Sequence, residues 1–163
     1  MKSLSWLFLV LAIMVSMTQV AFAVDEEAGV SAAAGSGSEL VLSDFNTGDK
    51  PNNIGGDFGA WDKDPNDETQ SMQMSFESED ALGDKMGYSV RLDYDVDSPN
   101  PAYNGFWMKL NDLDASAYNT LNFYIRGDAQ AGFSKRVKIE LKDSSKQPSP
   151  YILSGVTETW QKV

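Results

Sequence analysis

Residues 103–128 read YNGFWMKLNDLDASAYNTLNFYIRGD and hold two aromatic runs joined by a polar connection. Aromatic and branched aliphatic residues of this kind favour β-strands. In the second run apolar and polar residues alternate, so that Leu121, Phe123 and Ile125 share one face. Aromatics beside polar residues also suit a sugar-binding sheet, because a pyranose has an apolar face and a rim of hydroxyls. The stretch therefore predicts two strands and assigns these three residues to a core.

Short alternating runs separated by turn clusters continue on both sides of this stretch. They cover residues 40–45, 70–76, 88–96, 133–142, 151–153 and 159–163. Gly, Asn, Asp and Pro are concentrated between the runs, as in the loop 46–67. No segment has sustained helical periodicity. The pattern predicts an all-β fold, an antiparallel β-sandwich or jelly roll, with one domain over residues 39–163.

The first residues have the features of a secretory signal peptide. Lys2 precedes the apolar run 4–15, and Ala21-Phe22-Ala23 is a small-x-small cleavage signal. The apolar run is too short for a membrane span. We therefore expect residues 1–23 to be a leader, residues 24–38 to be a flexible linker, and the mature protein to be secreted or periplasmic with no membrane association.

Composition excludes several classes of function. The chain has 24 acidic and 13 basic residues, no His and no Cys. The absence of these two residue types excludes a Ser-His-Asp triad, thiol catalysis and the usual zinc ligands. The acidic balance argues against nucleic acid and anionic membrane surfaces as partners, and it fits neutral ligands and calcium.

The order of the motifs resembles a known family. Residues 114–128 contain D-x-S-x-Y-x-x-L-x-F-x-I-R-G-D, and residues 160–163 read WQKV. Together with GFWMKL at 105–110 and KRVKIELKD at 135–143, these motifs resemble the family 11-like carbohydrate-binding modules and the CIA30-type galactose-binding-like domains. The resemblance covers about residues 40–163.

The resemblance implies a galactose-binding-like jelly roll with a sugar-binding cleft on one sheet face and a structural calcium. Similar domains continue past the W-x-x-V motif with further strands, so we expect a sandwich that is incomplete after Val163. A catalytic domain encoded downstream is then a candidate partner. Related domains also act as assembly or interaction modules, so the fold alone does not settle the function.

Candidate carbohydrate-binding residues are aromatic or can exchange hydrogen bonds with hydroxyls. They are Trp61, Asp93, Tyr103, Phe106, Trp107, Tyr124, Arg126 and Tyr151. Phe106 and Trp107 are neighbours on one strand, so only one of them faces the ligand side or solvent. The resemblance favours Phe106 for that side, whereas Lys109, which shares a face with Trp107, favours Trp107.

Each candidate also has a purely structural interpretation. Trp61 either stacks on a sugar or folds back over one end of the core. Arg126 either donates a fork of hydrogen bonds to vicinal hydroxyls or forms an ion pair with Asp93 or Asp95. Both interpretations are open at the level of sequence.

An acidic loop provides a candidate metal site. The candidate calcium ligands are Asp44, Asn46, Asp49 and Asp57. Calcium takes six to eight oxygen ligands, which loops rich in Asp, Asn and carbonyl groups supply. The same residues are equally typical of a solvated loop with turn-forming Asp and Asn.

Three functions follow from these observations. The first is an exported, non-catalytic carbohydrate-binding module that recognises a polysaccharide such as a β-glucan or a shorter oligosaccharide. The second is a glycoside hydrolase, or the accessory domain of one, which needs two carboxylates about 5–10 Å apart. With 24 acidic residues such a pair arises by chance. The third is a protein-interaction or assembly module, whose mark would be a cleft without exposed aromatics.

Overall fold

The computed structural model describes residues 5–9, 14–16, 39–78, 82, 87–145 and 147–163, the first two segments by their backbone alone. The described part of the chain consists of strands and loops without a helix, which confirms the prediction of an all-β fold. The strands are β1 (Ser5–Leu9), β2 (Met14–Ser16), β3 (Glu39–Val41), β4 (Phe58–Asp62), β5 (Ser71–Glu77), β6 (Ser89–Asp95), β7 (Asn104–Met108), β8 (Thr120–Asn122), β9 (Tyr124–Gly127), β10 (Arg136–Lys142), β11 (Pro148–Ser154) and β12 (Gln161–Lys162).

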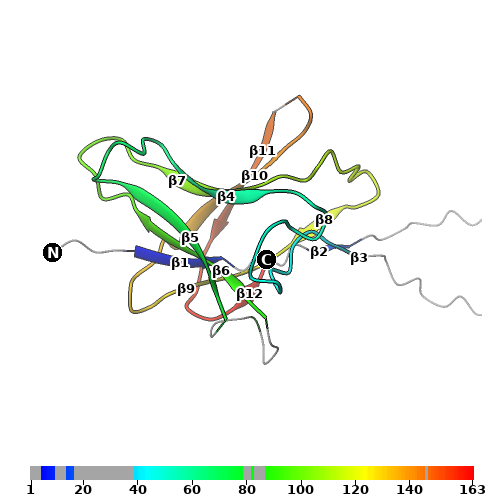
Figure 1. Cartoon of the computed structure of the whole chain (residues 1–163), viewed down its shortest axis with the longest axis horizontal. Coiled ribbons are helices and arrows are strands. Elements are labelled where there is room, and N and C mark those ends of the chain that lie inside the picture. The colour runs from blue at the N-terminus through cyan, green and yellow to red at the C-terminus, as the bar shows by residue number, and fades with distance from the viewer. Residues whose placement is uncertain (1–4, 10–13, 17–38, 79–81, 83–86, 146) are drawn as a thin grey trace, which may run out of the picture.

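The strands form small antiparallel sheets, as predicted (Figure 1). The largest has five strands in the order β12-β9-β1-β6-β5, and a second has the order β3-β2-β8. Two pairs, β4–β7 and β10–β11, complete the set. The β10–β11 hairpin projects away from the other strands in Figure 1. No sheet formed by the described residues closes on itself.

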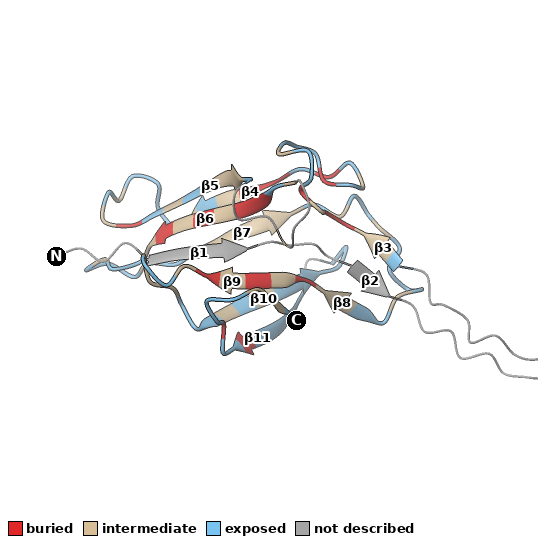
Figure 2. Ribbon diagram, turned by 90° about the horizontal axis from the view of Figure 1, so that it is seen from below, coloured by how far each residue is buried: buried red, intermediate tan, exposed pale blue. Residues whose placement is uncertain are grey.

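Two of these sheets face each other across a shared aromatic core. Val90 and Leu92 of β6 are buried on the inner face of the five-stranded sheet. Phe58 of β4 is fully buried against them, and Phe106 of β7 packs on the same cluster. Figure 2 shows red, buried segments in both β4 and β6. Burial of each such side chain contributes about 1.5–3 kcal/mol, so this cluster holds the β4–β7 pair against β5 and β6 in a sandwich-like arrangement.

A second cluster joins β6 and β9 to the C-terminal segments. Tyr94, Phe123 and Ile125 are buried here together with Leu153. Phe123 and Ile125 are buried in the core, as predicted. Leu121 is only half-buried and packs at the edge of the cluster. Tyr94 also receives a hydrogen bond at its hydroxyl from the Ser134 amide, at 2.7 Å. Its polar end is therefore satisfied inside the core.

The backbone of β1 lies between β6 and β9. It pairs antiparallel with β6 from Ser5↔Tyr94 to Leu9↔Val90, and with β9 through Phe8↔Arg126. Because both neighbours are antiparallel to β1, β6 and β9 run parallel to each other, two strand spacings or about 9.5 Å apart. The predicted leader includes β1 and β2, and its remaining residues lie outside the described part, as does the predicted linker 24–38. Signal-peptide cleavage therefore stays a prediction.

Asp67 ties two loops together. Its Oδ1 accepts hydrogen bonds from the Thr69 hydroxyl at 2.6 Å and from the Thr69 amide at 3.0 Å. Its Oδ2 accepts from Gln70 Nε2 and from Asn100 Nδ2, each at 3.0 Å. These donors, the Thr69 hydroxyl first, hold the pKa of the Asp67 carboxyl far below its ordinary value. The loop before β5 is thereby joined to the loop after β6.

This carboxylate makes stability depend on acid pH. Because the pKa of Asp67 is lowered on folding from 3.8, the unfolded chain binds more protons, and stability falls as the pH drops below about 4. We predict that Asp67→Asn flattens the fall in urea midpoint between about pH 4 and pH 2.5. Asp64→Asn, in the same loop, is the control. Equal flattening in both variants would contradict the role given to Asp67.

The position of β1 can be tested because the chain has no native Cys. In the full-length chain, Phe8→Cys with Arg91→Cys places two thiols at paired positions of β1 and β6. Paired Cα atoms in an antiparallel ladder lie about 4.5–5.5 Å apart, which a disulfide accommodates. We expect mild oxidation to cross-link this pair, as measured by non-reducing electrophoresis and mass spectrometry. The out-of-register pair Phe8→Cys with Leu92→Cys should stay reduced, and equal cross-linking in both would refute this register.

Candidate functional site

The β4–β7 pair has one face in the core and one face away from it. Phe58 pairs with Met108 and Ala60 with Phe106, and the core cluster includes Phe58, Phe106 and Met108. Because side chains alternate along a strand, Trp61 and Trp107 belong to the opposite face. The structure therefore places Phe106 toward the core, with its ring centroid 5.9 Å from that of Phe58, and Trp107 on the outer side.

A glycine faces each of these tryptophans across the pair. Trp61 pairs with Gly105, and Trp107 pairs with Gly59. A Cβ atom added to Gly105 would lie 3.1 Å from Trp61 Nε1, and one added to Gly59 would lie 3.3 Å from Trp107 Nε1. Each indole thus lies across the bare backbone of the neighbouring strand. The sequence carries this signal as two G-x-W tripeptides, Gly59-Ala60-Trp61 and Gly105-Phe106-Trp107, which the sequence analysis did not interpret.

Tyr103 extends this surface at the start of β7. Its ring lies edge-on to that of Trp61, with centroids 5.8 Å apart and an interplanar angle of 74°. Trp61 is 41% exposed and Tyr103 is 55% exposed, while Trp107 is half-buried. We call Tyr103, Trp61 and Trp107 the aromatic strip. It brings together three of the predicted carbohydrate-binding residues on one outer face.

Three lysines, which we call the lysine set, lie against the aromatic strip. Lys50 Nζ and Lys109 Nζ are 5.9 Å and 5.8 Å from a ring centroid of Trp107. Lys63 Nζ is 5.8 Å from the centroid of Tyr103. These distances are within the range of cation–π attraction. The sequence predicted only that Lys109 shares a face with Trp107, and the positions of Lys50 and Lys63 beside the rings were not predicted.

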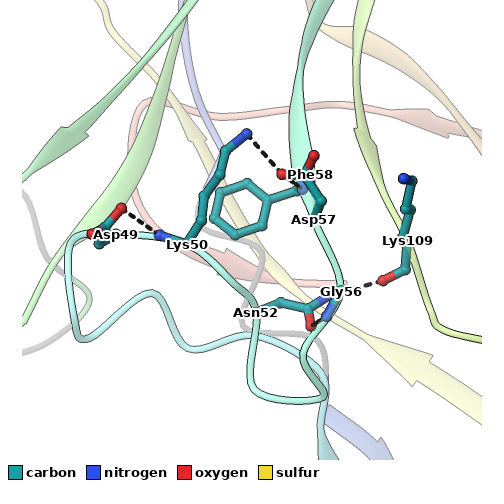
Figure 3. A network of polar contacts seen from close by, with 7 residues as sticks. All are labelled: Asp49, Lys50, Asn52, Gly56, Asp57, Phe58 and Lys109. Atoms are coloured by element: carbon teal, nitrogen blue, oxygen red, sulfur yellow. Dashed lines mark hydrogen bonds and ion pairs between the residues drawn. The ribbon is translucent and has the colours of Figure 1, made fainter.

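Local contacts fix the ammonium groups of two of the three lysines. Lys50 Nζ forms an ion pair with Asp57 Oδ1 at 2.8 Å, as Figure 3 shows. This hydrogen bond is the main reason why the pKa of the Asp57 carboxyl lies below its usual value. Lys63 Nζ donates a hydrogen bond to the Pro101 carbonyl at 2.9 Å. The ammonium groups of Lys50 and Lys63 are therefore held beside the aromatic strip.

Asn52 joins the loop that carries Lys50 to the end of β7 (Figure 3). Its Nδ2 donates to the Lys109 carbonyl at 2.9 Å, and its Oδ1 accepts from the Gly56 amide at 2.6 Å. The Lys109 amide in turn donates to the Asp57 carbonyl at 2.8 Å. Asn52 is buried, so these bonds are shielded from water. The network holds the backbones of this loop and of residue 109 together at one end of the aromatic strip.

The polar candidates lie on another surface. Ile125 of β9 is buried, so Tyr124 and Arg126 belong to the outer face of the five-stranded sheet. Asp93 of β6 shares that face and accepts a hydrogen bond from Arg91 Nε at 2.8 Å. The core cluster of β4, β6 and β7 separates this face from the aromatic strip. The structure therefore does not bring Tyr124, Arg126 and Asp93 to Trp107.

Two of the predicted carbohydrate-binding residues, Arg126 and Tyr151, have surroundings that the sequence did not predict. The guanidinium of Arg126 lies 5.3 Å from the Trp160 ring centroid, a contact that the sequence analysis did not anticipate. Tyr151 is 59% exposed on the β10–β11 hairpin, where it pairs with Ile139, and it belongs to a different sheet from the aromatic strip. The eight predicted residues are thus divided among the core, the aromatic strip, the outer face of the five-stranded sheet and this hairpin.

The calcium candidates are only partly brought together. Asp44 and Asn46 line a hollow of about 250 Å³, and Asp44 Oδ1 accepts a hydrogen bond from the Asn46 amide at 3.1 Å. Asp49 accepts from the Lys50 amide at 2.7 Å, and Asp57 pairs with the Lys50 ammonium. Within the described ranges, no group of three or more acidic side chains is placed to hold a metal. A calcium ion at Asp57 Oδ1 would compete with the ammonium of Lys50.

Comparison with protein-family models, with curated proteins and with solved structures finds no match for this chain. In the part of the chain that the structure describes, no helix is long and apolar enough to cross a bilayer.

The contact between Gly105 and the Trp61 indole can be tested by a substitution that is not expected to lower stability. Gly105→Ala places a Cβ atom 3.1 Å from Trp61 Nε1, so we expect the indole to move off the backbone of β7. Alanine in a strand is more stable than glycine by about 0.5–1 kcal/mol, so the urea midpoint should not fall. The nuclear magnetic resonance signal of the Trp61 indole N–H, assigned with Trp61→Phe, should shift. An unchanged signal would show that the indole does not lie on Gly105.

Proposed function

We propose that residues 39–163 form a non-catalytic carbohydrate-binding module of jelly-roll type that holds a polysaccharide, such as a β-glucan, on the aromatic strip. The single observation that supports this function is the pairing of Gly59 with Trp107 and Gly105 with Trp61, beside the exposed ring of Tyr103. It sets large aromatic surfaces along one outer face of one strand pair. The proposal includes an exported protein, based on the leader-like residues 1–23.

The physical basis is the match between aromatic rings and sugar rings. A pyranose stacks its apolar C–H face on an aromatic ring while its hydroxyls stay in contact with water and polar groups. Tyr and Trp suit this role because each combines a flat apolar body with one hydrogen-bonding group. Indoles already seated on glycine backbone lose little further freedom on binding. A site with few stacking positions should bind in the micromolar to millimolar range, about −8 to −4 kcal/mol.

The other functions have less support from this surface. A glycoside hydrolase needs a general acid whose pKa is raised toward neutrality. The carboxyl in contact with the lysine set, Asp57, has its pKa lowered instead. An interaction module would be marked by a face without exposed aromatics, whereas Trp61 and Tyr103 are exposed. A structural calcium at the loop of Asp44 and Asn46 remains part of the proposal, and its test is calcium-dependent stabilisation.

Removal of one ring tests the proposed function. Trp61→Ala should weaken binding to soluble β-glucans or mannans by about tenfold, or about 1.4 kcal/mol, in titration calorimetry or affinity electrophoresis. The matched control is Tyr151→Ala, which removes a similarly exposed ring from a different sheet. This control should bind like the parent chain. If the folded parent protein bound none of the polysaccharides tested, the proposed function would be wrong.

A further inference from the structure

The lysine set concentrates positive charge on the aromatic strip of an acidic chain. The whole chain has 24 acidic and 13 basic residues, yet Lys50, Lys63 and Lys109 gather around Tyr103 and Trp107. Lys50 is paired with a carboxylate, that of Asp57. In the described ranges no carboxylate lies within ion-pair distance of Lys63 or Lys109. Two of the three ammonium groups, those of Lys63 and Lys109, are therefore available to a bound anion.

We propose that the aromatic strip binds an anionic glycan, one whose sugar rings carry uronate carboxylates or sulfate esters. This inference rests on the proposed function and specifies its ligand. Sugar rings stack on the exposed rings of Trp61 and Tyr103, and the negative groups pair with the ammonium groups of Lys63 and Lys109. The excess of acidic residues in the sequence favours neutral ligands, and the local arrangement overrides that expectation.

The position of the lysines distinguishes anionic from neutral sugars. Two ammonium groups lie near the Trp107 indole, so a neutral sugar would have to displace or desolvate them in order to stack there. An anionic sugar keeps those ammonium groups in place and gains a charge-assisted hydrogen bond to each one that it reaches. The same residues thus penalise one class of ligand and favour the other, which is how binding sites obtain specificity.

Salt screening makes the local charges the relevant ones. At physiological ionic strength the Debye length is about 8 Å, so exposed acidic residues farther away than this are largely screened. Contacts between the lysine set and a bound sugar are shorter than that length. The acidic residues that lie farther from the strip than this therefore oppose anion binding only weakly.

The test compares glycans that differ only in charge, with the full-length chain as the protein. Polygalacturonate is compared with its methyl ester, and a sulfated galactan with its desulfated form, by titration at about 0.05 M and about 0.5 M salt. We expect at least one charged form to bind about tenfold more tightly than its neutral partner at low salt. High salt should remove most of this preference. Which charged form is preferred tells uronate from sulfate.

Charge-removing variants assign the effect to particular residues. Lys109→Gln should weaken binding of the charged glycan by about threefold to tenfold, and it should leave binding of the neutral partner unchanged or slightly tighter because one ammonium no longer has to be desolvated. Lys63→Gln should act in the same direction. The matched control is Lys138→Gln, an exposed lysine of β10 that pairs with Glu140 at 3.0 Å and lies on a different sheet. This control should bind like the parent chain.

The possible failures can be told apart. If neutral glycans bind through Trp61 and charged forms bind no better, the charge inference is overturned and the proposed function stands. If charged glycans bind but Lys138→Gln weakens them as much as Lys109→Gln, the attraction is unspecific and the inference is again overturned. If no charged or neutral glycan binds the folded chain, both the inference and the proposed function fall.

Discussion

The register between β4 and β7 is the constraint on which the candidate surface depends. Phe58 and Phe106 pack in the core, and Gly59 and Gly105 therefore lie on the opposite face of the β4–β7 pair, together with the two indoles. A slip of one residue would send an aromatic ring outward and an indole inward, because side chains alternate strictly along a strand. The burial of Phe58, with the ring of Phe106 against it, opposes that slip. The core thus determines which rings reach the surface, and the missing side chains of Gly59 and Gly105 leave room for the two indoles against the backbone.

The lysines beside the aromatic strip lie in loops and not in the strands β4 and β7. Asn52 fastens the loop of Lys50 to the end of β7, and Asp67 fastens the two loops at the other end, near Lys63 and Tyr103. Both networks are built from short polar side chains that satisfy backbone groups, which is what Asn and Asp do well in turns. The same loops that read as merely solvated and acidic in the sequence place cations beside aromatic rings.

Period-two alternation was enough to predict the all-β class of the fold and the buried positions of residues 123 and 125. It identified Phe123 and Ile125 as core, since their neighbours Tyr124 and Arg126 are polar. Alternation could not say which face of β7 is inside, because β7 carries large apolar side chains on both faces. That question depends on pairing with β4, a contact between segments distant in the sequence. The separation of Tyr124 and Arg126 from Trp107 depends in the same way on how two sheets stack.

The place of β1 between two parallel neighbours links folding to processing. The residues that form this strand are the same residues that read as an export leader. Removal of residues 1–23 would leave β6 and β9 with two facing rows of unpaired backbone donors and acceptors, too far apart to bond with each other. The same segment would then serve either as a signal peptide or as a strand of the sheet. If the leader were removed before the sheet forms, the strand between β6 and β9 would be lost from it.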